Sequence, residues 1–301
     1  MMGHNEGRSK VRIRSLFYFC PFFILTAPAF GQQLADSDRI ERPEKIGIAS
    51  WPVRGQARMI RDIDQTGANW FYDWSEGKGQ DDPRFVPMIW GRGKLVPAAK
   101  SILLAFNEPD ERRQAAMSVH EAIRLWPQLM ATGARLSSPA TSRYETLGPD
   151  SWQERFMSRA EKLDYRVDFM AVHYYTVDPD IEAFRKFLDD VHSRYGRPIW
   201  VTEWALADWV GSVRFTAKEQ RAFFEAAVQM LDDLPYVERH AWFGSYAGLD
   251  GSDLNSELVG NDGHLTGLGE SFRAAAAGTL KGSRCDRAAE QRNLSAGQIA
   301  C

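Results

Sequence analysis

The stretch "SILLAFNEPD" (residues 101–110) begins as an apolar run and ends in Asn107, Glu108, Pro109 and Asp110. A short continuous apolar run next to turn residues is typical of a fully buried strand. Pro109 ends such a strand because it has no backbone N–H to donate. We therefore expect a buried strand that presents the carboxyl group of Glu108 at its carboxyl end.

Eight short β-rich apolar runs alternate with longer amphipathic stretches along the chain. The runs cover residues 45–51, 68–75, 84–91, 101–109, 134–141, 167–176, 198–207 and 237–246. Runs of this kind, rich in β-branched and aromatic residues and flanked by turn residues, predict strands.

Most of the intervening segments have apolar residues three and four positions apart, which predicts amphipathic helices. The clearest are residues 111–132, 151–163, 180–196 and 216–234. In the last of these, Thr216 and Glu219 have the spacing of a capping box. Because only a short segment separates the third and fourth predicted strands, we expect one helix to be reduced to a turn.

Eight strands that alternate with helices over roughly 240 residues predict an α/β fold, the (β/α)₈ or TIM barrel. We place it in residues 40–280 as a single domain. The alternative is an open doubly wound sheet, which is expected to carry a glycine-rich phosphate turn after its first strand. Here the first run continues into "WPVRGQAR" (residues 51–58), which has one glycine, so the barrel is favoured.

The amino-terminal segment, residues 1–31, has the order of a secretory signal peptide. Basic residues precede an apolar run of about fifteen residues, which the small-residue stretch Ala27-Pro28-Ala29 follows. A membrane span needs about 20 apolar residues, and an uncleaved anchor is the alternative. We expect a secreted or periplasmic protein whose mature domain has no membrane partner.

The remaining composition narrows the possible partners. The net charge of −3 gives no reason to expect a nucleic acid as partner. Without the signal segment two cysteines remain, Cys285 and Cys301, both in or next to a polar tail (residues 281–301). In an exported chain such a pair is compatible with one disulfide, and two free thiols are the alternative. We expect a monomer.

The polar residues at the strand ends indicate the chemistry, because the active site of such a barrel lies at the carboxyl ends of its strands. Glu108 and Glu203 fall at the ends of the fourth and seventh predicted strands. Two carboxylic acids are the minimum for cleaving a glycosidic bond, since one protonates the leaving oxygen while the other attacks the anomeric carbon or activates water. The residues alone leave open which glutamate has which role.

Several neighbouring residues fit a sugar site. Asn107 can hydrogen-bond a sugar hydroxyl. His173 and Tyr175 alternate with Tyr174 and so point to the same side of the sixth strand, where either can orient Glu203. Aromatic residues near strand ends are candidates for stacking on sugar rings, although we expect one or two of them to be packing residues. They are Trp74, Trp90, Trp204 and Trp242.

Six segments in fixed order resemble glycoside hydrolase family 128, the endo-β-1,3-glucanase-like group. They are "NWFYDWS" (69–75), "FVPMIWG" (85–91), "LLAFNEPD" (103–110), "AVHYYT" (171–176), "VTEWA" (201–205) and "HLTGLGESF" (264–272). The resemblance spans residues 45–275 and implies a retaining β-1,3-glucan hydrolase, with Glu108 as acid/base and Glu203 as nucleophile. It also implies a place near the donor sugar for Asn107, Trp74, His173, Tyr175 and Trp204.

The resemblance departs from the family pattern at two positions, and other functions remain to be weighed. Asp73 stands where an Asn is expected, and Phe272 where a Tyr is expected, a change that we interpret as one of packing. The alternatives are the same chemistry on a mannan or xylan, and a carbohydrate-binding barrel without turnover. A metal-dependent barrel hydrolase would commonly have a His-x-His pair, which this sequence lacks, so we expect no metal and no cofactor.

Overall fold

The computed structural model describes residues 45–93, 101–249 and 253–280. The predicted signal segment, the tail and the two cysteines Cys285 and Cys301 lie outside these residues. In the part of the chain that is described, no helix is both long and apolar enough to cross a membrane.

The described residues contain eight strands, all paired in parallel. They are β1 (Ile46–Ala49), β2 (Trp70–Tyr72), β3 (Met88–Ile89), β4 (Ile102–Asn107), β5 (Arg135–Ala140), β6 (Met170–Thr176), β7 (Ile199–Leu206) and β8 (Val237–Phe243). Each lies within one of the predicted runs. The strands form a five-stranded group in the order β2-β1-β8-β7-β6 and a three-stranded group in the order β3-β4-β5.

Two parallel bridges connect these groups at both of their edges. Phe71 pairs with Phe85 just before β3, and Ser137 of β5 pairs with Phe169 just before β6. The strands therefore follow one another around the molecule in chain order, which is the arrangement of a (β/α)₈ barrel. The predicted fold class is confirmed.

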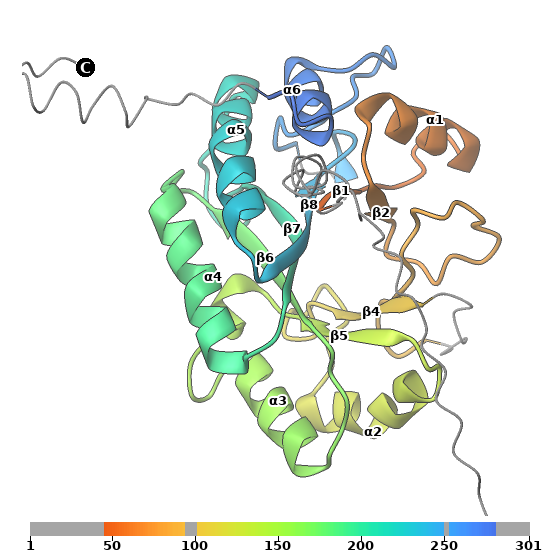
Figure 1. The fold of residues 1–301 in the computed structure, drawn as a ribbon, viewed down its shortest axis with the longest axis vertical. Coiled ribbons are helices and arrows are strands. Elements are labelled where there is room, and N and C mark those ends of the chain that lie inside the picture. The colour runs from red at the N-terminus through yellow and green to blue at the C-terminus, as the bar shows by residue number, and fades with distance from the viewer. Residues whose placement is uncertain (1–44, 94–100, 250–252, 281–301) are drawn as a thin grey trace, which may run out of the picture. The chain divides into compact units, whose positions relative to one another are not determined.

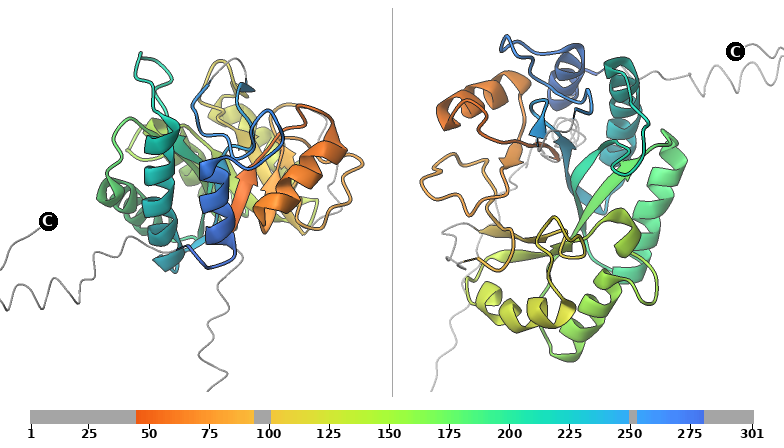
Figure 2. Two further views of the ribbon diagram at one scale, coloured as in Figure 1. Left: turned by 90° about the horizontal axis from the view of Figure 1, so that it is seen from above. Right: turned by 180° about the vertical axis from the view of Figure 1, so that it is seen from behind.

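The helices lie outside the strands, as Figure 1 shows. They are α1 (Gln56–Thr66), α2 (Val119–Met130), α3 (Trp152–Lys162), α4 (Ile181–Tyr195), α5 (Ala217–Asp233), α6 (Gly267–Ala276) and the short 3₁₀ helix η1 (Arg143–Glu145). The right-hand view of Figure 2 shows α1 beside α6 and α2 beside α3. Residues 73–87, all of them described, contain no helix. Between β3 and β4, where a helix reduced to a turn is predicted, residues 94–100 lie outside the description.

Local capping sets where the helices begin. The Thr216 side chain accepts a hydrogen bond from Glu219 N, and the Glu219 side chain accepts one from Thr216 N, so the predicted capping box is present. Helix α2 begins at Val119 rather than at residue 111, because Ser118 caps it and Ala116 has a positive φ of 48°. A non-glycine residue in that region of φ interrupts a helix.

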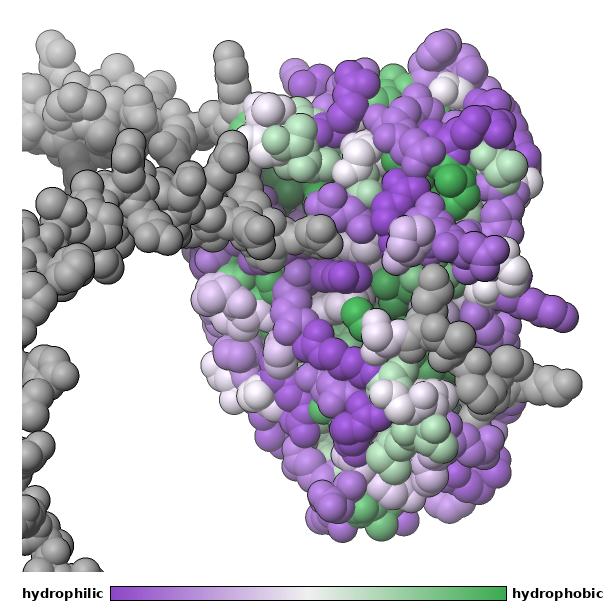
Figure 3. All heavy atoms as spheres, turned by 45° about the vertical axis from the view of Figure 1, so that its right-hand side comes forward, coloured by the Kyte–Doolittle hydropathy of each residue, from purple (hydrophilic) through white to green (hydrophobic). Residues whose placement is uncertain are grey.

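Two layers of apolar side chains hold the barrel together. The interior layer includes Trp70 of β2, which packs against Trp200 of β7 at a ring distance of 5.1 Å. Since β2 and β7 are not neighbours, this contact crosses the barrel interior. A larger layer fills the space between strands and helices and includes Trp126 and Phe224. The surface in Figure 3 is mainly hydrophilic, with hydrophobic residues scattered among polar ones, as on most water-exposed protein surfaces.

Candidate active site

Glu108 is held at the end of β4 by its backbone. Its N–H donates to Ala140 O of β5 at 2.7 Å, and Met117 N donates to Pro109 O at 2.8 Å. Glu108 has a φ of 37°, a left-handed value that non-glycine residues rarely adopt. Strain of this kind persists where surrounding structure enforces it, commonly at functional sites. The Glu108 side chain is 15% exposed.

Glu203 points into the barrel because β7 has an irregularity at Thr202. Val172 pairs with Val201 and His173 pairs with Glu203, so Thr202 is an extra residue without a partner on β6. An extra residue of this kind re-aims the side chains that follow it. Trp200 and Glu203, three residues apart, therefore both face the interior, which strict alternation along a strand would not allow.

Three neutral donors surround the Glu203 carboxylate. Trp74 Nε1 donates to Oε1 at 2.9 Å, the Tyr72 hydroxyl donates to Oε1 at 3.1 Å, and the Tyr175 hydroxyl donates to Oε2 at 2.8 Å. Burial, reinforced by the negative charge of Glu203, raises the pKa of Tyr72 and of Tyr175 well above 10. Both hydroxyls therefore keep their protons and remain hydrogen-bond donors to the Glu203 carboxylate.

His173 lies between the two glutamates and is fully buried. Its Nδ1 is 2.8 Å from Glu108 Oε1, and its Nε2 is 3.4 Å from Glu203 Oε1. Burial lowers the pKa of His173, but the charges of Glu203 and Glu108 outweigh burial and raise this pKa above its ordinary value. Burial also raises the pKa of Glu108, with His173 opposing and Glu203 adding to the shift. A carboxyl group with a raised pKa is suited to donate a proton near neutral pH.

The same three side chains are also a possible set of metal ligands. One oxygen of Glu108, one nitrogen of His173 and one oxygen of Glu203 all lie within 4.8 Å of one another. Both oxygens of Glu203 already accept hydrogen bonds from Trp74, Tyr72 or Tyr175, and His173 Nδ1 is bonded to Glu108. The hydrogen bonds on Glu203 and on His173 Nδ1 fit a site that moves protons; His173 Nε2 has no hydrogen-bond partner among the described residues and lies 3.4 Å from Glu203 Oε1.

The structure brings together most of the side chains that the sequence selects. Trp74, His173 and Tyr175 all contact one of the two carboxyl groups, as described above. Asn107 is buried next to Glu108; its Nδ2 donates to Gln114, whereas its Oδ1 has no hydrogen-bond partner among the described residues. Trp90, at the end of β3, is 39% exposed. Its backbone carbonyl accepts a hydrogen bond from Asn107 N.

Trp204 and Trp242 lie elsewhere, and the prediction that they stack on sugar is wrong. Both are 0% exposed and pack against each other at 4.7 Å on the helix side of the strands, with Phe224 of α5 beside them. The reason is strand alternation. Trp204 follows the inward-facing Glu203, and Trp242 precedes the inward-facing Phe243, so both tryptophans face outward. Phe272 is fully buried against Phe224, in line with the packing role predicted for it.

Four aromatic residues at the site were not selected from the sequence. Tyr72 lies two positions before Trp74, and strand alternation is a signal that identifies it. Phe243 contacts both Trp74 and Tyr175, at ring distances of 6.0 and 5.6 Å. Trp209, in the loop after β7, is 49% exposed and meets Tyr175 edge-on at 5.1 Å. Trp51, after β1, lies 6.1 Å from Trp74.

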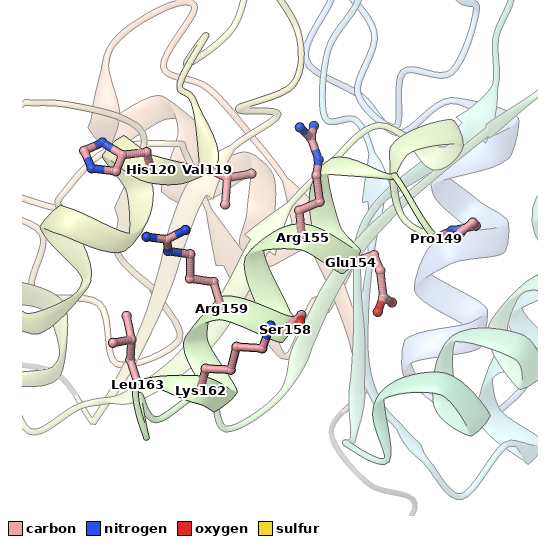
Figure 4. Close-up of a pocket in the computed structure, with 9 residues that line it drawn as sticks. All are labelled: Val119, His120, Pro149, Glu154, Arg155, Ser158, Arg159, Lys162 and Leu163. Carbon is pink, nitrogen blue, oxygen red and sulfur yellow. The ribbon is translucent and has the colours of Figure 1, made fainter.

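A separate cavity of about 640 Å³ lies on the outside of the barrel between α2 and α3. Figure 4 shows three basic side chains along α3, those of Arg155, Arg159 and Lys162, with His120 on the facing side. All four are exposed. None of them contacts Glu108 or Glu203, and a solvated basic helix face accounts for them.

The geometry at the barrel mouth defines a class of protein. Two carboxyl groups on facing strands, one with a raised pKa and one surrounded by hydrogen-bond donors, form the site of a glycoside hydrolase. The chain belongs to the family described as Glycosyl hydrolase catalytic core, which matches residues 49–272.

Individual relatives agree with this family. Alkali-sensitive linkage protein 1 of Schizosaccharomyces pombe is 30% identical over 223 residues, which make up 68% of this chain and 40% of that protein. The chain thus spans less than half the length of this curated relative. A crystal structure of a GH128 subgroup I endo-β-1,3-glucanase from Amycolatopsis mediterranei, in complex with laminaripentaose, is 38% identical with a TM-score of 0.69. The similarity covers 77% of this chain and 99% of that one.

A second similar structure shows the fold alone. It is a GH128 subgroup VII oligosaccharide-binding protein from Cryptococcus neoformans, 22% identical with a TM-score of 0.63, over 79% of this chain and 96% of that one. The predicted family, glycoside hydrolase family 128, and the predicted class of enzyme, a glycoside hydrolase, are confirmed. Because the barrel also occurs in a protein named for binding, the carboxyl pair, rather than the fold, is what indicates turnover.

Proposed function

We propose that this chain hydrolyses β-1,3-glucan with retention of the anomeric configuration, with Glu203 as nucleophile and Glu108 as acid/base. The observation that carries the proposal is the short distance between the two carboxyl groups, whose nearest oxygens lie within 4.8 Å. Retaining glycosidases have carboxyl groups about 5–5.5 Å apart, whereas inverting enzymes need roughly 6.5–9.5 Å to admit a water molecule. The spacing supports retention.

The first step breaks the glycosidic bond. A Glu203 oxygen attacks the anomeric carbon as Glu108 transfers its proton to the leaving oxygen, which departs as an alcohol. The raised pKa of Glu108 supports its protonated state at the start of this step. The three donors on Glu203 keep its carboxylate in one orientation while the new C–O bond forms.

The second step restores the enzyme. Glu108, now ionised, accepts a proton from a water molecule whose oxygen attacks the anomeric carbon, and the bond to Glu203 breaks. His173 hydrogen-bonds to Glu108 in the resting state, and a positively charged imidazole favours the ionised form of this carboxyl group. We therefore assign His173 as the residue that positions Glu108 and eases its change of charge.

The similar structures and the aromatic residues support glucan as the substrate. The Amycolatopsis relative is named as an endo-β-1,3-glucanase in complex with a laminari-oligosaccharide. In this chain, two further aromatic rings lie near the carboxyl groups. Both Trp51, which is half-buried, and Trp209, which is exposed, contact Phe243. Flat aromatic faces pack well against C–H-rich sugar faces. The unpartnered Asn107 Oδ1 is an acceptor for a sugar hydroxyl.

Reducing-end release from a linear β-1,3-glucan tests the proposal, with Glu203→Gln as the inactive comparison. We expect the variant to lose on the order of 10⁴-fold or more in kcat, since it removes the covalent route. Glu270→Gln, an exposed site on α6, is the matched control and should cleave normally. Proton NMR of the first product formed gives its anomeric configuration, and an initial α-anomer from a β-glucan contradicts retention. Release from mannan or xylan but not from glucan contradicts the proposed substrate.

We also propose that the protein is exported and acts as a monomer. The basic residues, apolar run and small residues within residues 1–31 support export. The network of Glu108, His173 and Glu203 is complete within one chain, which supports a monomer. Amino-terminal sequencing of the mature protein and sedimentation analysis test these two points. An uncleaved segment that remains with the membrane, or a stable dimer, contradicts them.

A further inference from the structure

A second, smaller cavity lies beside the candidate active site, between the segment after β1 and the segment after β8. Its volume is about 60 Å³, and its polar lining comes from Arg54, Arg58, Asp62, Tyr246, Glu257 and Asn261. A single water occupies about 30 Å³ in the liquid. The cavity therefore admits the hydroxyl-bearing edge of a ring, but the ring itself must remain outside.

One carboxylate oxygen in this lining lacks a partner. Glu257 Oε2 is buried and accepts no hydrogen bond from any described residue. A buried polar atom without a partner is costly, so its presence needs an explanation. The neighbouring Asp62 is different, because it accepts hydrogen bonds from Arg58 Nε, Gln65 Nε2 and the Tyr246 hydroxyl. Among the acids of this cavity, Glu257 is the one with a free acceptor.

The charges around the cavity balance. Two arginines, Arg54 and Arg58, face two acids, Asp62 and Glu257. Arg54 Nη1 donates to Asn261 O at 2.8 Å, which ties the two segments together. The Arg58 guanidinium is fixed against Gly263, where a Cβ would lie 1.9 Å from Nη2. A rigid, polar cavity without excess charge suits an uncharged ligand with hydroxyl groups rather than an ion.

A continuous row of aromatic rings connects Glu203 with the cavity. Trp74 donates to Glu203, Trp51 lies 6.1 Å from Trp74, and Tyr246 lies 5.9 Å from Trp51. Each step is comparable with the length of one sugar ring. Trp51 and Tyr246 are both partly exposed, so a glycan that leaves the carboxyl pair in this direction meets first aromatic surface and then the cavity.

We propose that this cavity is a distal glycan subsite, in which Glu257 accepts a hydrogen bond from a hydroxyl group of a glucosyl unit that packs on Tyr246 and Trp51. The inference rests on the proposed function for the class of sugar. It adds a specificity-determining residue, Glu257, outside the catalytic network. The subsite acts only on substrates long enough to reach it, and so it makes the enzyme prefer longer chains.

A ladder of linear β-1,3-gluco-oligosaccharides, from trisaccharide to heptasaccharide, tests this length dependence. For Glu257→Ala we expect kcat/KM on the longest substrates to fall about 5- to 10-fold, the effect of one hydrogen bond. On the shortest substrate that is cleaved, the rate should stay within about twofold. Glu257→Gln keeps an acceptor oxygen and should recover part of the loss. Glu270→Gln is the matched control on the same carboxyl-terminal segment.

Each outcome of this experiment supports or overturns the inference. An equal loss on all lengths, or no loss on the longest, overturns it. Melting temperatures show whether Glu257→Ala is unfolded. If it is, the length dependence of kcat/KM is measured on Glu257→Gln instead, which keeps the size of the side chain. If the wild type cleaves no glucan, the proposed function fails, and calorimetric titration with the heptasaccharide decides on the subsite. Weaker binding by Glu257→Ala than by wild type then supports the subsite, and equal binding overturns it.

Discussion

The two groups of strands contribute unequally to the candidate active site. The five-stranded group, β2-β1-β8-β7-β6, provides Glu203, its three donors and the bridging His173. The three-stranded group, β3-β4-β5, provides Glu108 and Asn107, and it holds Glu108 mainly through backbone hydrogen bonds. One carboxyl group is thus enclosed by side chains, whereas the other projects from a strained strand end.

The difference corresponds to what each carboxyl group does in the proposed reaction. Glu203 must stay ionised until it attacks, and its hydrogen bonds come from groups that keep their protons, two phenols and an indole. Glu108 must gain and lose a proton in each cycle, and its side-chain partner is the one titratable base in the network, His173. In that reaction the five-stranded group holds the carboxylate that attacks, and the three-stranded group holds the carboxyl group that exchanges a proton.

The largest loss of activity is expected from Glu108→Gln. The amide cannot donate an acidic proton, so cleavage of glucan should fall by about 10²- to 10⁴-fold, the usual contribution of general acid catalysis. An aryl β-glucoside with a very acidic phenol as leaving group needs little protonation and should lose far less in the first step. Comparing the two substrates by reducing-end and phenolate release checks the role of Glu108. Equal losses on both substrates contradict an acid role.

A smaller loss of activity is expected from removing one of the hydrogen-bond donors to Glu203. Tyr175→Phe deletes the hydrogen bond to Glu203 Oε2 and should lower kcat about 10- to 100-fold, since a bond to a charged group contributes about 1.5–3 kcal/mol. Tyr174→Phe, at the next position on β6, alters a ring that stacks on Phe184 outside the barrel. This control should keep normal kcat. If the two variants behave alike in steady-state kinetics, the assignment of inward and outward faces is wrong.

The pH dependence tests the contact between the two groups of strands. Glu108 acts in its protonated form, so kcat/KM should fall as pH rises through the pKa of Glu108. The hydrogen bond and charge of His173 lower that pKa, against the larger effect of burial. His173→Asn removes the charge, and the alkaline limb of the profile should therefore move to higher pH. A drop in rate with an unmoved limb would leave His173 as a structural residue only.

Much of the fold could be predicted because local and global signals agree. The eight β-rich runs and the four clearest helical segments all correspond to observed elements, since hydrophobic periodicity reports burial directly. The start of α2 was missed although Ser118 and Glu121 have the spacing of a helix N-cap signal. What the sequence does not show is the positive φ at Ala116 and the bonds from Ala115 N to Asn107 O and from Met117 N to Pro109 O, which hold the segment before the helix on the end of β4. The extra residue at Thr202 was missed for a similar reason, since register is a property of paired strands.

The carboxyl pair was found because strand ends in a barrel converge, but the aromatic residues were sorted less well. Alternation selected His173 and Tyr175 on β6 correctly, and the same rule on β7 and β8 would have removed Trp204 and Trp242. It would also have selected Phe243. Trp209 and Trp51 lie in loops, where no period applies, and only the folded chain shows that they flank the site.

The smallest effects are expected from two tryptophans, Trp209, which is half-exposed beside the candidate active site, and Trp204, which is buried between β7 and α5. Trp209→Ala removes half-exposed aromatic surface beside Tyr175 and should raise KM for glucan about 3- to 10-fold, from the 0.5–1.5 kcal/mol that an aromatic contact contributes. Its melting temperature should stay unchanged. Trp204→Phe removes part of a fully buried ring and should cost about 1–3 kcal/mol of unfolding free energy with unchanged KM. Kinetics and thermal unfolding of both variants separate the two roles. A raised KM in Trp204→Phe would contradict a pure packing role for Trp204. A lowered melting temperature in Trp209→Ala would contradict a pure sugar-binding role for Trp209.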